Sequence, residues 1–245
     1  MTITLNGTTG ITTPDITSSG ALGVDASAPD NSLVVNSSGN VGIGTSSPTT
    51  NLEINGGTNN NIVRIVSTDA NANIEFADNT TTSGCQIGAN GDNIKFGISG
   101  TERMRIDSAG RVTMPYQPAF AAGFSTAQNL SSGQLCVFDT AALNIGSHYS
   151  TSTGRFTAPI AGTYQFQYSN NITRISGSWS GFTFRKNGSN YRRAYDDTSA
   201  NWANISLSFI VYLNANDYID IANADTSSCG HDGYFYGSFT GHLIG

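Results

Sequence analysis

The chain contains 245 residues, with 17 acidic and 11 basic side chains, so its formal net charge is −6 at pH 7. Proteins that neutralise nucleic-acid phosphates need basic surfaces, so this charge excludes nucleic acid as a partner. Charged residues make up only 11 % of the chain, and no run approaches the ~18 consecutive apolar residues of a membrane-spanning helix. We therefore expect no nucleic-acid partner, no membrane insertion, and a surface hydrated by amides and hydroxyls.

A change in aromatic content divides the chain near residue 114. Residues 1–114 contain two of the 24 Phe, Tyr and Trp residues, and residues 115–245 contain the other 22. We interpret residues 115–245 as a head domain. The part before it is interpreted as a stalk at residues 31–114, preceded by an attachment segment at residues 1–30.

The stalk alternates short β-rich segments with Gly, Asn and Ser, and it has no sustained 3.6-residue apolar period. This pattern predicts strands joined by turns and no helix. The clearest expected strands are residues 3–5, 33–35, 62–66 and 94–98. Intrinsic disorder is the alternative, because a composition rich in Ser, Asn and Gly favours it.

A weak internal repeat runs through the same region, since residues 16–24 align with residues 35–43 and again with residues 106–114. A single repeat of this size cannot bury its own apolar face and must stack on neighbours. Because the stalk has few large side chains, we expect the neighbours to be other copies of the chain. The sequence therefore predicts a slender stalk intertwined from several chains.

Two sequence motifs in the stalk resemble those of a known class of proteins. Residues 38–48 (SGNVGIGTSSP), followed by LEI at 52–54, and residues 101–112 (TERMRIDSAGRV) resemble the stalks of phage tail fibres. The resemblance implies a virion protein that acts at the exterior of the host cell, with its N-terminus bound to baseplate or tail proteins. Many such stalks end in a self-cleaving chaperone domain, which residues 115–245 do not resemble, so another element must drive assembly.

The head has strand patterns of period two. Tyr164, Phe166 and Tyr168 fall on one face of an expected strand, and Gln165 and Gln167 fall on the other;. The expected strands are residues 134–138, 162–168, 181–185, 205–213, 218–221 and 233–239. This pattern predicts a two-sheet sandwich or jelly roll.

The head also carries a family resemblance. Residues 154–166 (GRFTAPIAGTYQF) resemble the signature of the complement C1q-like, TNF-like jelly roll, and residues 206–221 and 237–244 resemble its later strands. Asn216 and His242 depart from the usual glycine and apolar residue. The resemblance implies a ten-stranded, tightly packed homotrimer with aromatic residues along its three-fold axis. The trimer and core signature comprises Phe156, Pro159, Gly162, Tyr164, Phe166, Phe239 and Gly241.

The aromatic count of the head agrees with that implication, because 22 aromatic residues exceed what one small sandwich needs and subunit interfaces are enriched in Tyr, Phe and Trp. The expected fold class is therefore all-β: a slender intertwined stalk followed by a C1q/TNF-like jelly-roll sandwich, assembled as a homotrimer.

No motif for catalysis is found. The nearest string to a serine-hydrolase GxSxG motif, residues 177–181, has Trp179 at the nucleophile position, and the three histidines lack metal-binding spacing;. We expect no enzyme activity, cofactor or metal. Calcium stays open as an alternative, because folding could bring carboxylates together without the usual 12-residue loop. The carboxylates concerned are Asp217, Asp220, Asp225 and Asp232.

A basic hairpin is the candidate binding site. The Asn187-Gly188 pair predicts a tight turn that concentrates four of the head's six basic residues, with aromatic residues nearby. The candidate receptor-binding residues are Arg185, Lys186, Tyr191, Arg192, Arg193, Tyr195 and Trp202. Arginines bind acidic sugars and phosphates, which points to a bacterial surface polysaccharide or lipopolysaccharide. The alternative is cross-strand pairing of these cations with Asp196 and Asp197.

We expect non-catalytic attachment of a phage to its host through a trimeric head. The first alternative is a purely structural fibre or capsid decoration whose head only drives trimerisation. A polysaccharide-degrading spike is the second.

Overall fold

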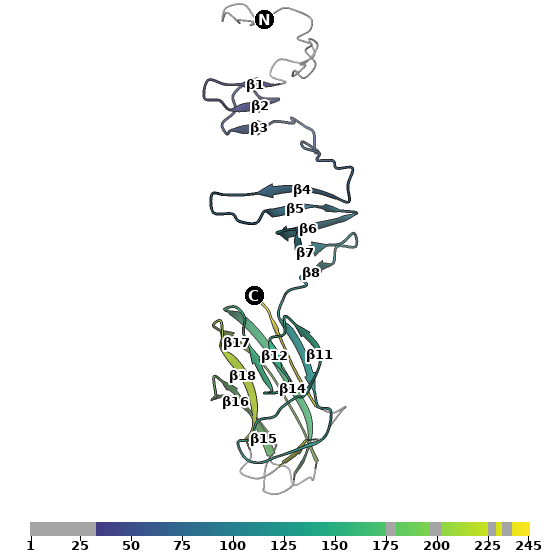
Figure 1. Cartoon of the computed structure of the whole chain (residues 1–245), viewed down its shortest axis with the longest axis vertical. Helices are drawn as coiled ribbons and strands as arrows, with labels where there is room; N and C mark the ends of the chain where they lie inside the picture. Colours follow the sequence, from purple (N-terminus) through teal and green to yellow (C-terminus); the bar gives the residue numbers. More distant parts are fainter. Residues whose placement is uncertain (1–32, 175–179, 197–201, 225–228, 232–236) are drawn as a thin grey trace, which may run out of the picture. The chain divides into compact units, whose positions relative to one another are not determined.

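The computed structural model describes residues 33–174, 180–196, 202–224, 229–231 and 237–245 (Figure 1). All regular elements in these ranges are β-strands, as the sequence predicts. Among the described residues, none forms a helix long and apolar enough to span a membrane. The chain divides into two compact units, Met1–Ala72 and Asn73–Gly245. The attachment segment at 1–30 and the expected strand at 3–5 lie outside the described residues.

The first unit contains a small three-stranded sheet. Strands β1 (Val34–Val35) and β2 (Val41–Ile43) pair antiparallel, and β3 (Leu52–Ile54) pairs parallel to β2. Asn36 orders the β1–β2 turn because its side-chain oxygen accepts hydrogen bonds from the backbone N–H groups of residues 38 and 40, each at 3.0 Å.

The expected strand at residues 62–66 is absent in the described chain. These residues have no ladder partner among the described residues, and all four apolar side chains are exposed. The prediction of a strand was therefore wrong for a single chain. The physical reason is that β-branched residues favour extended backbone, but a strand also needs a neighbouring backbone to bond.

A second sheet is built from five consecutive strands in chain order: β4 (Asn71–Phe76), β5 (Cys85–Asn90), β6 (Asn93–Ile98), β7 (Thr101–Ile106) and β8 (Val112–Thr113). Ser99 and Gly100 join β6 to β7 and both have positive φ, at 52° and 73°. This is the backbone of a two-residue type I′ turn.

The register of this sheet separates apolar from polar side chains. Ile87 faces Phe96 and Phe96 faces Met104, while Ile94 faces Ile106. On the opposite face, Gln86 on β5 donates a hydrogen bond to Glu75 on β4, and Arg105 pairs with Glu102 on the same strand, β7. The apolar stalk face comprises Ile74, Phe76, Cys85, Ile87, Ala89, Ile94, Phe96, Ile98, Met104, Ile106 and Val112.

The residues from 119 onward form a sandwich of two sheets. One sheet has the order β10-β19-β14-β20-β9-β11, with β17 also paired to β14, and the other has the order β12-β13-β18-β15-β16. The strands are β9 (Ala119–Gly123), β10 (Gln128–Leu130), β11 (Thr140–Ile145), β12 (Tyr149–Ser150), β13 (Arg155–Thr157), β14 (Gly162–Arg174), β15 (Ser180–Lys186), β16 (Ser189–Asp196), β17 (Trp202–Leu213), β18 (Tyr218–Asn223), β19 (Cys229–His231) and β20 (Ser238–Leu243). The described part of the head thus has twelve strands, against the ten that the resemblance implied.

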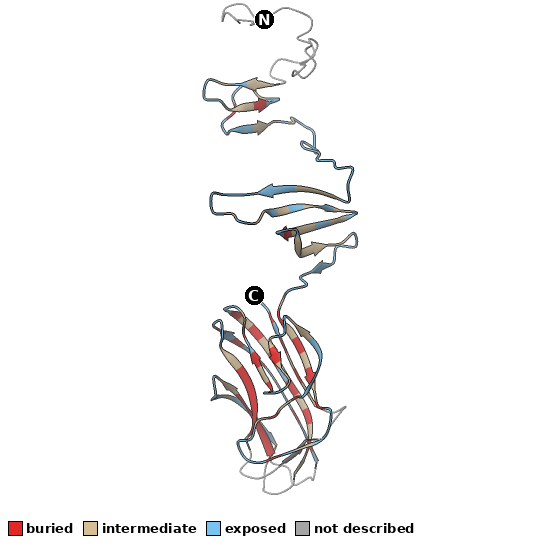
Figure 2. Ribbon diagram, in the orientation of Figure 1, coloured by how far each residue is buried: buried red, intermediate tan, exposed pale blue. Residues whose placement is uncertain are grey.

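The core lies between these two sheets (Figure 2). The predicted alternation along β14 is present, since Tyr164, Phe166 and Tyr168 are fully buried while Gln167 is exposed. Phe120 stacks on Tyr149 with ring centroids 4.7 Å apart. The buried aromatic residues are Phe120, Phe124, Phe138, Tyr149, Phe156, Tyr164, Phe166, Tyr168, Phe182, Phe184, Phe209 and Phe239.

These buried rings correct the argument from aromatic count. Twelve of the 22 aromatic residues of the head pack inside a single chain, so the number alone does not indicate a subunit interface. Phe156, Tyr164, Phe166 and Phe239 each have an exposed fraction of 0 %, and they are therefore inaccessible to a second chain. Rings of this size fill the space between two sheets with few residues.

The two signature glycines permit close packing around these rings. A Cβ atom on Gly241 would lie 2.5 Å from Cδ1 of Phe166 and 2.7 Å from Cε1 of Phe120. A Cβ atom on Gly162 would lie 2.8 Å from Cδ1 of Leu243. Pro159 lies in the preceding turn and is half-buried.

Two expected strands of the head differ from the structure. Residues 134–138 form one isolated bridge, from Leu135 to Ala222, and the Cys136 N–H donates to the Ile221 carbonyl at 2.8 Å. The segment follows the edge of β18 over too few residues to form a strand. Of the expected strand at 233–239, residues 233–236 lie outside the described residues.

Candidate functional site

The predicted basic hairpin is present. Asn187 and Gly188 have φ values of 52° and 79°, as a type I′ turn requires, and they join β15 to β16;. The ladder pairs Thr183 with Arg193, and a bulge interrupts it near Tyr191. Adjacent side chains of a strand point to opposite faces of the sheet, so Arg185 and Lys186, like Arg192 and Arg193, are divided between the two faces, and the four cations do not form one cluster;.

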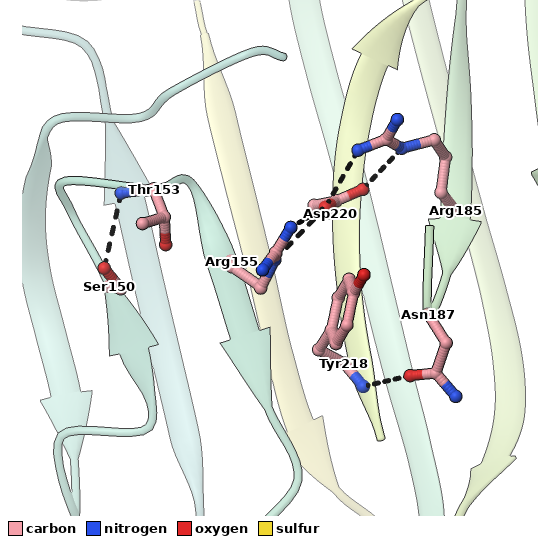
Figure 3. A network of polar contacts seen from close by, with 7 residues as sticks. All are labelled: Ser150, Thr153, Arg155, Arg185, Asn187, Tyr218 and Asp220. Carbon is pink, nitrogen blue, oxygen red and sulfur yellow. Dashed lines mark hydrogen bonds and ion pairs between the residues drawn. The ribbon is translucent and has the colours of Figure 1, made fainter. Parts of the chain in front are cut away.

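Arg185 is bound to an aspartate instead of facing the other hairpin cations. Its Nε and Nη2 groups donate to the two carboxylate oxygens of Asp220 at 2.7 Å and 3.0 Å. From the other side, Arg155 donates to the same carboxylate through Nε and Nη2 at 3.3 Å and 3.2 Å (Figure 3). The hydrogen bonds to Asp220 raise the pKa of Arg185 above its usual value. One buried carboxylate therefore holds two guanidinium groups.

Lys186 belongs to a different polar network at the end of the hairpin. Its ammonium group lies 3.0 Å from Asp217 and also donates to the Tyr212 carbonyl at 3.1 Å. The Asn187 amide donates to Asp217 at 2.7 Å, and this bond, together with those from the Asn214 N–H and Lys186, lowers the pKa of Asp217 to about 2. Lys186 therefore contributes to the structure of this turn and shares its charge with Asp217.

Arg192 and Arg193 remain the exposed cations of the hairpin. The Arg192 guanidinium lies over the Tyr191 ring at 4.4 Å, and Arg193 Nε donates to the Thr183 hydroxyl at 3.3 Å. Neither arginine forms an ion pair with another described residue. Together with Asn190 they line a pocket of about 180 Å³.

A larger groove of about 440 Å³ lies between β16 and β17. These are edge strands, one from each sheet, so the groove lies along one side of the sandwich, between the two sheets. It is lined by Arg193, Ala194, Tyr195, Asp196, Asn204, Ile205 and Ser206. Tyr195 and Arg193 are thus brought together as predicted, whereas Trp202 is exposed on β17 but lines neither of these cavities. Asn204 and Ser206 were missed because isolated amides and hydroxyls carry no distinctive sequence signal.

Two of the four carboxylates considered for calcium, Asp217 and Asp220, lie in the described part of the chain. Asp217 and Asp220 are each held by cationic partners, and Asp225 and Asp232 lie outside the described residues. Among the residues that the structure describes, no three His, Cys, Asp or Glu side chains gather as a metal site would require. The alternative pairing partner Asp197 also lies outside these residues; Arg185 and Lys186 pair with Asp220 and Asp217 instead.

Comparison with known proteins places the head in a family. The C1q domain family matches residues 119–244. Among solved structures, the chain is similar to the globular domain of zebrafish complement 1qA, with 17 % identity over 53 % of this chain and 98 % of that chain, and a TM-score of 0.45. It is also similar to Eiger TNF from S. frugiperda, with 11 % identity over 53 % and 94 % of the two chains and a TM-score of 0.45. Murine APRIL shares 8 % identity over 52 % of this chain and 99 % of its own, with a TM-score of 0.44.

Proposed function

The chain belongs to the C1q domain family, and on that premise we propose that it is a homotrimeric phage tail-fibre protein that attaches the virion to its host without catalysis. The all-β, C1q/TNF-like fold expected from the head motif is confirmed. Domains of this class are generally non-enzymatic binding modules and typically form homotrimers. A trimer of such heads on a stalk is a multivalent binder.

The observation that carries the proposal is the apolar stalk face. Among the described residues of one chain, residues 71–113 form no second sheet that could cover it, and Ile94 and Phe76 on it are 51 % and 54 % exposed. Along β5 the apolar residues Cys85, Ile87 and Ala89 are exposed, while Gln86, Gly88 and Asn90 between them are half-buried. This is the reverse of the usual burial of apolar residues. Burying one such side chain contributes about 1.5–3 kcal/mol. Three chains that turn these faces inward would share the core that one chain lacks.

The head has a second apolar surface suited to contact between copies. Ile210 and Tyr212 on β17 are both exposed and point away from the sandwich core. Ile210 lies beside Gln165, whose other neighbour is His242 on β20. Exposed tyrosine and isoleucine next to neutral polar groups match the composition of a subunit interface. We assign this face of the seven-stranded sheet to contacts between heads.

Receptor binding is assigned to the hairpin side of the head. Arg192 and Arg193 supply positive charge that no described carboxylate pairs with, and Tyr195 supplies an exposed ring beside the groove. Guanidinium groups bind carboxylates and phosphates in a bidentate manner, so an acidic envelope polysaccharide is the expected receptor. When three identical weak sites bind one polymer, the later contacts are intramolecular, so the trimer binds far more tightly than one site does. Residues 1–30 are assigned to attachment to other virion proteins.

The test uses the full chain in two measurements. Light scattering at low concentration should give a mass near three chains, and the trimer should bind host cells and purified envelope polysaccharide without releasing reducing ends. A folded monomer would contradict the proposal. A trimer without cell binding would identify a purely structural fibre or decoration, and released reducing ends would identify a degrading enzyme.

A further inference from the structure

The ion cluster around Asp220 is an unusual feature of the outer face of the five-stranded sheet. Ile219 and Ile221 are buried in the core, so Asp220 between them points away from it;. The exposed fraction of Asp220 is nevertheless 0 %. No second layer of the sandwich lies on this face among the described strands. The side chains of the flanking strands β13 and β15 therefore cover the carboxylate, including those of Arg155 and Arg185.

The charges in this cluster do not balance. Two guanidinium groups surround one carboxylate, so one positive charge remains. Each arginine uses its Nε and Nη2 groups for Asp220, and neither Nη1 group has a hydrogen-bond acceptor among the described residues. The arginine side chains are 35 % and 22 % exposed. Donors with a net positive charge are therefore held at the surface.

Tyr218 adds a polar group beside the two arginines. Its ring lies 3.9 Å from Cζ of Arg155 (Figure 3), and its backbone N–H is fixed by the Asn187 side chain at 2.9 Å. The Tyr218 hydroxyl has no hydrogen-bond partner in the described chain. A Cβ atom on Gly188 would approach this hydroxyl to 3.2 Å, so the glycine leaves room next to it.

We propose that Arg155 and Arg185, oriented by Asp220, form an oxyanion-binding subsite for a carboxylate or phosphate group of an acidic polysaccharide. In naming a polysaccharide, the inference rests on the proposed function. Asp220 restricts both side chains before the ligand arrives, which reduces the conformational entropy lost on binding. The Nη1 groups, which Asp220 does not use, provide charged donors that an oxyanion accepts, and the Tyr218 hydroxyl is a further donor for a neighbouring sugar oxygen.

The subsite continues into the hairpin pocket. Asn190 pairs with Arg185 in the ladder and also lines the pocket of Arg192 and Arg193. Arg155 lies on β13 and Arg193 on β16, three strand spacings apart in the sheet order. At the ~4.8 Å spacing of neighbouring strands this is roughly 14 Å. One acidic polymer chain can thus place successive anionic groups at both positions.

The experiment measures binding of small anions to the full-length protein by calorimetry. The probes are inorganic phosphate and glucuronate, with glucose as the uncharged control. Arg155→Gln is the main variant because it leaves a neutral Arg185–Asp220 pair, which preserves folding while removing the net charge. We expect the wild type to bind at least one of the two anions, glucose to give no signal, and Arg155→Gln to lose affinity at least tenfold. Which anion binds more tightly distinguishes a phosphate from a uronate receptor.

Two further variants separate the subsite from a general charge effect. Arg155→Lys keeps the positive charge but loses the planar guanidinium group, so we expect an intermediate affinity for the anion. The matched control Arg64→Gln on the stalk should bind the anion as the wild type does. Equal affinity of wild type and Arg155→Gln, or no binding of either anion by the wild type, would overturn the subsite. Host-cell binding is measured in parallel. Cell binding that is unaffected by Arg155→Gln rejects the subsite but leaves the proposed function intact. Anion binding that depends on Arg155, without any cell binding, supports the subsite and rejects the proposed function.

Discussion

The Arg185 guanidinium donates to both carboxylate oxygens of Asp220, and these residues lie opposite each other on β15 and β18. The pair fixes an arginine that hairpin geometry alone would leave exposed. It also makes the carboxylate essential, because removing one member of a buried ion pair leaves an uncompensated charge.

We expect Asp220→Asn to lower the free energy of unfolding by about 3 kcal/mol, the lower end of the range for a broken buried pair. Arg155 and Arg185 would then repel each other without a counter-charge. The measurement is denaturant unfolding of the full chain, with the exposed Asp92→Asn as the matched control. Equal stability of the two variants would show that the cluster does not contribute to folding.

Gly241→Ala tests the close contact between β20 and the core rings. The added methyl group would lie 2.5 Å from Phe166, so a ring or the strand must move, and overpacking of this kind typically costs about 1–3 kcal/mol. We expect a lower thermal midpoint for this variant than for Gly245→Ala, where the added atom meets no neighbour within 4 Å. Identical midpoints would contradict the predicted clash.

Cys85 reports on the apolar stalk face. Cys85 is exposed in a single chain, and the proposed trimer should cover it. In a Cys229→Ser background, we expect a maleimide reagent to label Cys85 slowly in the native protein and rapidly after denaturation. Cys136 is buried within the head and serves as the internal reference for a protected thiol. Rapid native labelling of Cys85 would exclude this face from a chain interface.

The double variant Arg192→Ala with Arg193→Ala should weaken cell binding without dissociating the proposed trimer. Both side chains are exposed, and neither forms an ion pair among the described residues, so their removal changes little in the fold. The readouts are cell binding and native mass, with Arg64→Ala on the stalk as the control. Unchanged cell binding would reject the hairpin as a receptor contact.

Acid should destabilise the head through Asp217. Its pKa in the folded protein is about 2, below the usual 3.8, so the folded state favours the ionised form. The resulting stabilisation is present above about pH 4 and is lost as the pH falls from there towards 2. We expect the thermal midpoint to fall over this window, and to fall less in Asp217→Asn. Parallel curves for the two proteins would assign the acid sensitivity to other groups.

Short sequence patterns predicted the strands and turns that depend only on residues close together in the chain. Alternation placed Tyr164 and Phe166 inward along β14 because side chains of a strand alternate between faces. The Asn187-Gly188 pair predicted the β15–β16 turn because both residues tolerate positive φ. The head motif predicted the family because it contains residues, such as Gly241 and Phe166, whose close contact the core of this fold requires.

The ion cluster required the tertiary structure. Arg155 and Asp220 are 65 positions apart in the chain, and only the pairing of β13 with β18 brings them together. In the same way, residues 62–66 look like a strand but have no partner in the described chain, and the twelve buried rings belong to one chain's core. Composition, alternation and turn residues determined the all-β class and the hairpin, because these depend on neighbours in sequence. Which cations are paired and which are exposed was decided by strand register, because ion pairs form between residues that only the folded sheet makes adjacent.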